Sequence, residues 1–377
     1  MVYLDYASTE KMSLEAFEKY KEVAFSNFGN AGSTHKVGRD AARQLEGCRK
    51  ACLKALGIEK THDVIFTSGA TESNNMALKS IALHYQNRGK RIISSSAEHA
   101  SVLSSLAQLK NEFGFDVIEL DAKANGSIDV NELKENIDKN TIIVSLIGVN
   151  NETGAISPIK EVSEIVSSFP KCFFHCDATQ AIGKANIDYS RVDLVSLSAH
   201  KFGGPKGVGL LAYRKNISFL PLLSGGVQEH FFRSGTQDLP AIASMTVALE
   251  RTMKAPYPDK HVALLANKVR DYVSKNPAIL SLNSPNDASD FIVNFSFLIH
   301  KASVVLEALS EKEIYVSSVS ACSSKTEPVS HVLLSMGLDK GRAMNSMRVS
   351  FSRESKEEEV DLFLSTLDSL LKELSPR

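Results

Sequence analysis

Short apolar segments alternate with helical segments through the middle of this chain, and this alternation limits the possible folds more than any other feature. A parallel strand needs a crossover connection, usually a helix, and a sheet covered on both faces has strands that are apolar throughout. The expected strands are residues 63–68, 91–96, 116–120, 141–149, 171–177 and 193–200. The expected helices between them are residues 71–86, 101–114, 129–137 and 158–169. The pattern predicts an α/β fold with a mainly parallel sheet.

The pattern changes after residue 240. A long helix is expected at 241–254, and the Pro-rich segment 255–260 follows it. The later strands and helices are mixed in a way that is typical of a smaller α+β unit. They are expected at residues 290–299, 302–312, 314–320, 346–352 and 357–374. We therefore expect two domains, a large one at 15–254 and a small one formed by 1–14 together with 255–377.

The composition narrows the classes of function. Of the 377 residues, 43% are hydrophobic, and 43 basic and 44 acidic side chains leave a net charge of −1. No basic stripe is evident, so we do not expect binding to nucleic acid. No apolar run reaches the roughly 18 residues that span a bilayer, and the first residues do not resemble a secretory signal or transit peptide. The odd count of five cysteines favours free thiols and a reducing, cytoplasmic location.

The segment TSGATES (67–73) is a candidate anion site, because it joins an expected strand to an expected helix. Gly69 permits a sharp turn, and the first N–H groups of the helix would then face an anion such as phosphate. Thr71 and Ser73 would add hydroxyl donors. A plain turn is the alternative, since the segment is neither a Walker A loop nor a GxGxxG fingerprint.

The segment HCDATQ (175–180) ends another expected strand with an acid. Asp177 would lie at the edge where open α/β sheets bind ligands, with Gln180 on the same side of the turn. A buried carboxylate there needs a cation or hydrogen-bond donors. The alternative is that Asp177 caps a helix.

The segment SLSAHKFGGPKGVG (196–209) brings a lysine to the end of a further strand. A lysine that enters a pocket can lose its proton and attack an aldehyde, so Lys201 is a candidate nucleophile. Ser198 and His200 could hold a phosphate. Lys206 is the alternative nucleophile, although its position in the loop favours a solvated side chain.

Cys322 lies among serines in SSVSACSS (317–324), between an expected strand and a helical segment. Such a setting favours an exposed thiol, whereas a structural cysteine usually lies in an apolar run. An ordinary loop cysteine is the alternative. His99 follows a strand and is ambiguous by itself. The remaining cysteines are expected to pack in the interior, and they are Cys48, Cys52, Cys172 and Cys176.

Taken together, these segments resemble the cysteine desulfurases, which are pyridoxal-phosphate (PLP) enzymes of the class V aminotransferase superfamily with the fold type I architecture. The resemblance runs from YLDYAS (3–8) to RVSFS (348–352). Its other motifs are FTSGATESNN (66–75), EHASVL (98–103), VNNETGAI (149–156), DATQAIGK (177–184), SAHKFGGPKGVG (198–209), RSGT (233–236) and SACSS (320–324). The Ser-Ala-Cys segment is similar to that of the nitrogen-fixation and iron–sulfur-cluster group. The resemblance implies a seven-stranded, mainly parallel sheet in the large domain and a smaller α+β domain.

The resemblance also implies which residues bind PLP and substrate. Lys201 would bind the PLP aldehyde covalently, Asp177 would pair with the protonated ring nitrogen, and His99 would stack on the ring and move protons. The implied cofactor-binding residues are Ala70, Thr71, His99, Asn151, Asp177, Gln180, Ser198, His200, Lys201 and Thr236. Within this set, Thr236 would come from the neighbouring subunit of a homodimer. Asn151 and Arg348 would bind the substrate carboxylate.

The implied reaction converts L-cysteine to L-alanine and leaves the sulfur as a persulfide on Cys322. The sulfur would pass to an acceptor protein, such as an iron–sulfur scaffold or a tRNA-thiolation enzyme, and other acceptor pathways stay open. No resident metal is implied, although Cys322 could bind an iron–sulfur cluster transiently. The alternatives are a class V aminotransferase, a selenocysteine lyase or a non-catalytic paralogue on the same scaffold.

Several segments differ from the pattern of the desulfurase family. Near the start of the chain, Asn30-Ala31-Gly32-Ser33-Thr34-His35 replaces the usual Asn-Pro-Ser-Ser-x-His. Val319 stands where Gly commonly precedes the Ser-Ala-Cys, and Val227 stands where a third Gly is common. The segment Ser8-Thr9-Glu10 replaces the usual Thr-Thr-Pro. None of these belongs to the set implied to bind PLP.

Overall fold

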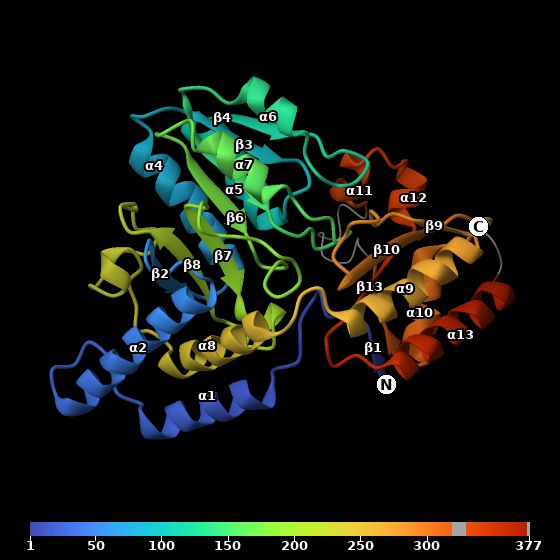
Figure 1. Ribbon diagram of the computed structural model, residues 1–377, viewed down its shortest axis with the longest axis horizontal. Helices are drawn as coiled ribbons and strands as arrows, with labels where there is room; N and C mark the ends of the chain where they lie inside the picture. Colours follow the sequence, from blue (N-terminus) through green and yellow to red (C-terminus); the bar gives the residue numbers. More distant parts are fainter. Residues whose placement is uncertain (319–328, 375–377) are drawn as a thin grey trace.

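The alternating segments of the sequence form the larger of two main sheets. The computed structural model describes residues 1–318 and 329–374 (Figure 1), and within them seven strands pair in the order β2-β8-β7-β6-β5-β3-β4. The strands are β2 (His62–Thr67), β3 (Arg91–Ser95), β4 (Asp116–Leu120), β5 (Thr141–Ile147), β6 (Phe173–Asp177), β7 (Leu194–Ser198) and β8 (Gly209–Arg214). Six of these seven strands run in one direction, and β8 runs in the opposite direction between β2 and β7. The mainly parallel seven-stranded sheet is therefore confirmed.

Helices cover both faces of this sheet, which explains why its strands are apolar on both sides. One face packs against α2 (Lys36–Ala55), α6 (Val130–Asn136), α7 (Ile159–Val166) and α8 (Leu239–Lys254). The other face packs against α3 (Ala70–Asn75), η1 (Met76–Ser80), α4 (Ile81–Tyr85) and α5 (Ala100–Phe113). Helix α1 (Leu14–Ser26) lies beside α8 (Figure 1), and Ser244 Oγ of α8 donates to Ala16 O of α1 at 2.7 Å.

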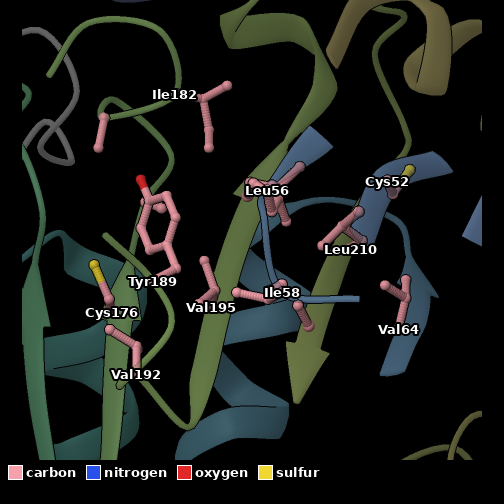
Figure 2. Close-up of a cluster of buried hydrophobic side chains, with 14 of the residues drawn as sticks. Cys52, Leu56, Ile58, Val64, Cys176, Ile182, Tyr189, Val192, Val195 and Leu210 are labelled. Atoms are coloured by element: carbon pink, nitrogen blue, oxygen red, sulfur yellow. The ribbon is translucent and has the colours of Figure 1, made fainter. Parts of the chain in front are cut away.

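The cysteines expected in the interior are buried there. Figure 2 shows Cys52 and Cys176 among apolar side chains between the sheet and its helices. Cys48 and Cys172 belong to the same cluster, and burial raises the pKa of all four thiols. The prediction of plain packing is confirmed.

A smaller sheet and its helices form a second apolar core. Its strands pair in the order β12 (Ser317–Ser318), β13 (Ser346–Ser350), β10 (Ile292–Phe297) and β9 (Leu280–Leu282), all antiparallel. The helices of this core are α9 (Lys260–Lys275), α10 (Ala302–Glu311) and α13 (Glu357–Glu373). The chain's first strand, β1 (Val2–Tyr3), joins the same core by pairing with β11 (Ile314–Tyr315). Two short helices, α11 (His331–Ser335) and α12 (Lys340–Met344), lie near β10 (Figure 1).

The structure differs from the expected elements in several places, and β1, α1, β9 and α12 are additional to the expected elements. The sequence analysis did not anticipate β8, which follows the glycine-rich segment. The helix expected at 71–86 contains the π-helical turn η1 in its middle. The strand expected at 314–320 is divided into β11 and β12, and residues 319–328, including Val319 and Cys322, lie outside the described residues. In the part of the chain that is described, no helix is long and apolar enough to cross a membrane.

Candidate active site at the carboxyl ends of the strands

The chemically suggestive segments of the sequence meet because each follows a strand that points the same way. The segments after β2, β3, β5, β6 and β7 all begin at one edge of the sheet, since these strands share one direction. Ligands of open α/β sheets bind at this carboxyl edge. Motifs far apart in the sequence can therefore form one site. Thr71 and Lys201, for example, are 130 residues apart in the sequence.

Asp177 ends β6, is buried, and has two hydrogen-bond donors. Asn74 Nδ2 donates to Asp177 Oδ2 at 2.7 Å, and Thr179 N donates to Oδ1 at 3.0 Å. Asn74 Nδ2 also donates to Ser101 Oγ at 2.9 Å, and that hydroxyl lies 2.9 Å from His99 Nδ1. A chain of hydrogen bonds therefore connects Asp177 to His99.

Burial keeps two histidines of this region neutral near pH 7. Burial lowers the pKa of His99, the charge of Asp177 opposes this effect, and the charge of Lys201 adds to it. His99 Nδ1 accepts from Ser101 N at 3.1 Å, so the neutral ring carries its proton on Nε2. Burial also lowers the pKa of His175 to about 4, and its ring contacts Ser145 Oγ and Ser196 Oγ at 2.8 and 2.9 Å. A neutral His99 has a nitrogen-bound proton and can exchange it with a neighbouring group.

Lys201 closes the short turn after β7, and its amine reaches the N-terminal segment of the chain. Lys201 Nζ donates to Ala7 O at 2.8 Å and to Ser8 O at 2.7 Å. Lys206, the alternative nucleophile, is exposed, as expected for a solvated loop lysine. Of the two candidate nucleophiles, Lys201 is thus the one whose amine lies at the edge of the sheet.

The turn between β2 and α3 lies against the end of β7. Gly69 has φ +150°, and a Cβ at this position would lie 3.2 Å from Ser198 Oγ. Thr71 and His99 line a groove of ≈ 660 Å³ between α3 and α5. Burial lowers the pKa of His200, which precedes Lys201, to about 4. Residues from three separate motifs therefore surround this turn.

Arg348 lies on β13 and is only 3% exposed. Its Nη2 donates to Asp5 Oδ1 and to Ser8 Oγ, both at 2.7 Å, and its Nη1 donates to Asn151 O at 2.8 Å. Among the described residues, its Nε is buried without a hydrogen-bond partner. The N-terminal segment therefore holds both Lys201 and Arg348.

The described residues on both sides of Cys322 are attached to this site, although Cys322 itself lies outside them. Before it, β12 pairs with β13, and Ser317 lies opposite Arg348. After it, Ser330 Oγ donates to Glu152 Oε2, next to Asn151.

Glu98 provides a second attachment for the segment that follows Cys322. His331 Nε2 donates to Glu98 O at 3.0 Å. The side chain of Glu98 is fully buried, and its Oε1 accepts from Ile147 N at 2.7 Å. Burial raises the pKa of this carboxyl well above its ordinary value. The segment after Cys322 thus contacts the turn that carries His99.

A comparison of the sequence with models of protein families identifies the family of this chain. Residues 2–363 match the model described as Aminotransferase class-V, which is nearly the whole chain. The chain belongs to the class-V aminotransferase family.

Individual members of this family are similar to the chain along its full length. The NifS/IcsS protein homolog of Lactobacillus delbrueckii subsp. bulgaricus is 39% identical, and the match covers 100% of this chain and 98% of the relative. The cysteine desulfurase IscS of Dictyoglomus turgidum is 37% identical, with 99% of this chain and 95% of the relative covered. A solved structure titled NifS-like protein superimposes with a TM-score of 0.91 at 33% identity, covering 99% of this chain and 100% of that one.

Class-V aminotransferases depend on PLP, and the residues at the carboxyl edge fit this cofactor. The site contains an amine that can bind an aldehyde, a buried carboxylate that can face a ring nitrogen, and the open turn at Gly69. Within the described residues, Asn74 Oδ1 and Thr179 Oγ1 are buried without a hydrogen-bond partner. When bound, PLP supplies the electron sink for reactions at the α-carbon of an amino acid.

Some residues of this class-V site were not identified by the sequence analysis, and one predicted residue, Thr236, is exposed. Asn74, Ser101, Lys184 and Asp5 lie inside the motifs that carry the resemblance but received no role. Their positions beside Asp177, Lys201 and Arg348 depend on contacts between distant segments. Thr236 is exposed and lies three residues after Arg233. Arg233 Nε pairs with Glu72 Oε1 of α3 at 2.8 Å.

Proposed function

We propose that this protein is a PLP-dependent cysteine desulfurase, EC 2.8.1.7, that converts L-cysteine to L-alanine and retains the sulfur as a persulfide on Cys322. The bond between Cβ and sulfur of the substrate breaks, and the sulfur forms a new bond with Cys322 Sγ. The names of the similar relatives support this activity. An iron–sulfur scaffold or a tRNA-thiolation enzyme is the proposed acceptor, and the cytoplasm is the proposed location.

The residues of the site have complementary tasks in this proposal. Lys201 would bind the PLP aldehyde and would serve as the base for the α-proton of the substrate, and Asp177 would keep the ring nitrogen protonated. Gln180 would hydrogen-bond the ring hydroxyl, and His99 would stack on the ring and exchange protons through Nε2. Arg348 and Asn151 bind the substrate carboxylate. The cofactor phosphate is held by residues of the two flanking turns, namely Ala70, Thr71, Ser198 and His200.

One observation carries the choice of a desulfurase over an aminotransferase. The residues before Cys322 pair with the strand of Arg348, and the residues after it are bonded to Glu152. Both described segments that flank residues 319–328 are therefore attached beside the site of Lys201, which supports the assignment of Cys322 as the sulfur acceptor. An aminotransferase has no need of a thiol there, whereas sulfur transfer requires one.

The protein acts as a homodimer in this proposal, with Thr236 completing the phosphate site of the partner. Large apolar side chains are exposed on α1 and just after it, where Phe17, Phe25 and Phe28 are 49%, 80% and 76% exposed. Others lie on the segment before Thr236, including Val227 and Phe231 at 64% and 66%. Exposed apolar groups of this size favour burial against another chain.

Mixing two inactive variants tests the shared site. In a mixed dimer of Lys201→Ala with Thr236→Ala chains, one site receives an intact Lys201 and an intact Thr236 only if Thr236 acts across the interface. Recovery of activity on mixing would support the proposal. A monomer in sedimentation, or the absence of any recovery, would contradict it.

Incubation with PLP and ³⁵S-cysteine tests the activity itself. We expect equimolar alanine and persulfide, label on Cys322, and a visible absorption band from bound PLP. Cys322→Ser should keep the band and lose the label, whereas the matched control Cys172→Ser should keep both. Lys201→Ala should lose the band.

The same experiment separates the proposal from its alternatives. Full sulfide release by Cys322→Ser would favour a lyase that does not use the thiol. Transamination of cysteine without persulfide would favour an aminotransferase. Wild-type protein that acquires no colour with PLP would contradict all of these enzyme functions.

A further inference from the structure

Lys184 is a buried lysine at the same edge of the sheet, and the proposed reaction does not use it. It lies in the segment DATQAIGK (177–184), four residues after Gln180, and only 4% of its surface is exposed. Lysine is almost never buried to this degree without partners, because removing an ammonium group from water costs free energy. Its burial therefore needs a reason.

The amine of Lys184 donates hydrogen bonds to two residues of the proposed PLP site. Its Nζ lies 2.9 Å from Lys201 O and 3.3 Å from Gln180 Oε1. An ammonium group can only donate, so it selects the oxygen of the Gln180 amide. The amide nitrogen then points the other way and donates to Ala7 O at 2.6 Å. Ala7 O can only accept, so Lys184 and Ala7 favour the same orientation of the Gln180 amide from its two ends.

These contacts also connect Lys184 to the amine of Lys201 through a series of hydrogen bonds. Ala7 O, which accepts from Gln180, also accepts from Lys201 Nζ at 2.8 Å. Lys184 is therefore connected to the main chain of Lys201 directly and to its side chain through Gln180 and Ala7. Loss of the Lys184 amine would remove a hydrogen-bond donor from Lys201 O and from Gln180 Oε1 and would loosen both connections.

The main chain of Lys184 has a separate structural contact. Ser289 Oγ donates to Lys184 O at 2.6 Å, which joins this segment to the smaller core. A change of the side chain leaves this bond in place. The charged groups that act on the amine are Glu10, Arg353 and Arg348; burial lowers the pKa of Lys184, and Glu10 opposes that effect.

We propose that Lys184 is a positioning residue, which holds the main chain of Lys201 and the amide orientation of Gln180 in the geometry that binds PLP. This inference rests on the proposed function, because it takes Lys201 as the residue that binds the aldehyde. It assigns the amine of Lys184 no contact with substrate.

Three substitutions and one control test this role. Lys184→Met keeps an unbranched side chain as far as Cε and removes the donor, Lys184→Arg keeps a cationic donor, and Lys184→Gln keeps a neutral donor. The control is Lys206→Met on the exposed loop nearby. We expect Lys184→Met to bind PLP about tenfold more weakly, equivalent to about 1.4 kcal/mol. The pH midpoint of its visible absorption band should also move, whereas Lys184→Arg and Lys206→Met should stay within about threefold of wild type.

The outcomes separate this inference from the proposed function. If wild type and Lys184→Met show equal PLP affinity and equal pH midpoints, the inference is wrong and the proposed function stands. If wild type gains no visible band, the proposed function is wrong. If Lys184→Met does not unfold cooperatively, the PLP affinities of Lys184→Gln and Lys184→Arg are compared instead. The inference then requires that Lys184→Gln, whose donor is neutral, binds PLP more weakly than Lys184→Arg, whose donor is cationic. Equal affinities would overturn the inference.

Discussion

Arg348 shows how a single side chain of this site depends on residues far away in the sequence. Its guanidinium is buried, and the carboxylate of Asp5 compensates its charge at 2.7 Å. Ser8 accepts from the same nitrogen and donates to Asp5 Oδ1 at 2.9 Å. These bonds hold the planar fork in one orientation, so that Nε remains for a further acceptor.

Replacement of Arg348 by lysine should weaken binding of the substrate carboxylate. A lysine keeps the charge and loses the planar fork, which removes hydrogen bonds to a charged group worth about 1.5–3 kcal/mol. We expect KM for cysteine to rise about tenfold or more, with PLP affinity nearly unchanged. Steady-state kinetics would measure this. Arg270→Lys, which changes an arginine paired with Asp290 in the smaller unit, is the control. An unchanged KM in Arg348→Lys would contradict the assigned role.

At the scale of elements, the outer edge of β2 is closed by a buried ion pair. Glu229 Oε2 accepts from Phe66 N at 2.9 Å, and Arg49 Nη1 donates to Val64 O. Arg49 and Glu229 also pair with each other at 3.1 Å. An edge strand with unpaired backbone groups invites association with other strands, and this pair satisfies those groups instead.

Glu229→Gln should destabilise the protein by about 3 kcal/mol, because it removes the buried counter-charge of Arg49 and leaves only the exposed carboxylate of Glu46. Glu46 pairs with the same arginine at 3.1 Å but is 51% exposed in its side chain, so it provides a matched control. We expect Glu46→Gln to cost less than about 1 kcal/mol. Urea denaturation would compare the two, and equal costs would show that burial of the pair does not matter.

The turn between β2 and α3 should tolerate only glycine at position 69. At Gly69, φ is +150° and a Cβ would approach Ser198, whereas at Gly57 φ is +72° and the space is open. Both Gly→Ala changes should cost about 1–2 kcal/mol from backbone strain. Gly69→Ala should in addition weaken PLP binding about tenfold, equivalent to about 1.4 kcal/mol, and Gly57→Ala should not. PLP titration of both variants checks this, and equal affinities would contradict it.

At the scale of the whole molecule, the smaller unit is joined to the larger one beside the site. Ser284 Oγ donates to Thr153 O at 2.6 Å, and Asn294 Nδ2 donates to Glu152 O at 3.1 Å. Both acceptors follow β5 at the carboxyl edge. The proposed site therefore depends on how these two units are held together, and the domain boundaries at 14/15 and 254/255 stay a prediction.

Stability of the whole chain should fall as the pH drops from about 6.5 to about 4. Burial lowers the pKa of His62 and of His175 from 6.5 to about 4. In this interval the unfolded state takes up protons and the folded state does not, so acid favours unfolding. Each histidine contributes a slope of about 1.4 kcal/mol per pH unit. His175→Gln should reduce the slope by about that amount, and the exposed His84→Gln should not change it. Equal slopes in urea denaturation would contradict the prediction.

Much of the site could be predicted, because strand ends and turn residues are local features. Asp177, Lys201 and the turn at Gly69 each follow an apolar strand, and parallel strands bring such ends to one edge. Asn74 and Ser101 could not be identified in this way. They are polar residues on helices. Only because α3 packs beside α5 can Asn74 and Ser101 connect Asp177 to His99 through hydrogen bonds.

The sequence by itself determined the α/β class, the mainly parallel sheet and the residues with reactive groups, since hydrophobic periodicity and side-chain chemistry act over a few neighbouring positions. It did not reveal β8, the π-helical turn η1, or the contacts of Lys184 and Asp5. Those depend on which distant surfaces pack together and which buried polar atoms then need partners. Hydrogen bonds between segments as distant as Asp5 and Arg348 exist only after the chain has folded, so the tertiary structure alone decided them.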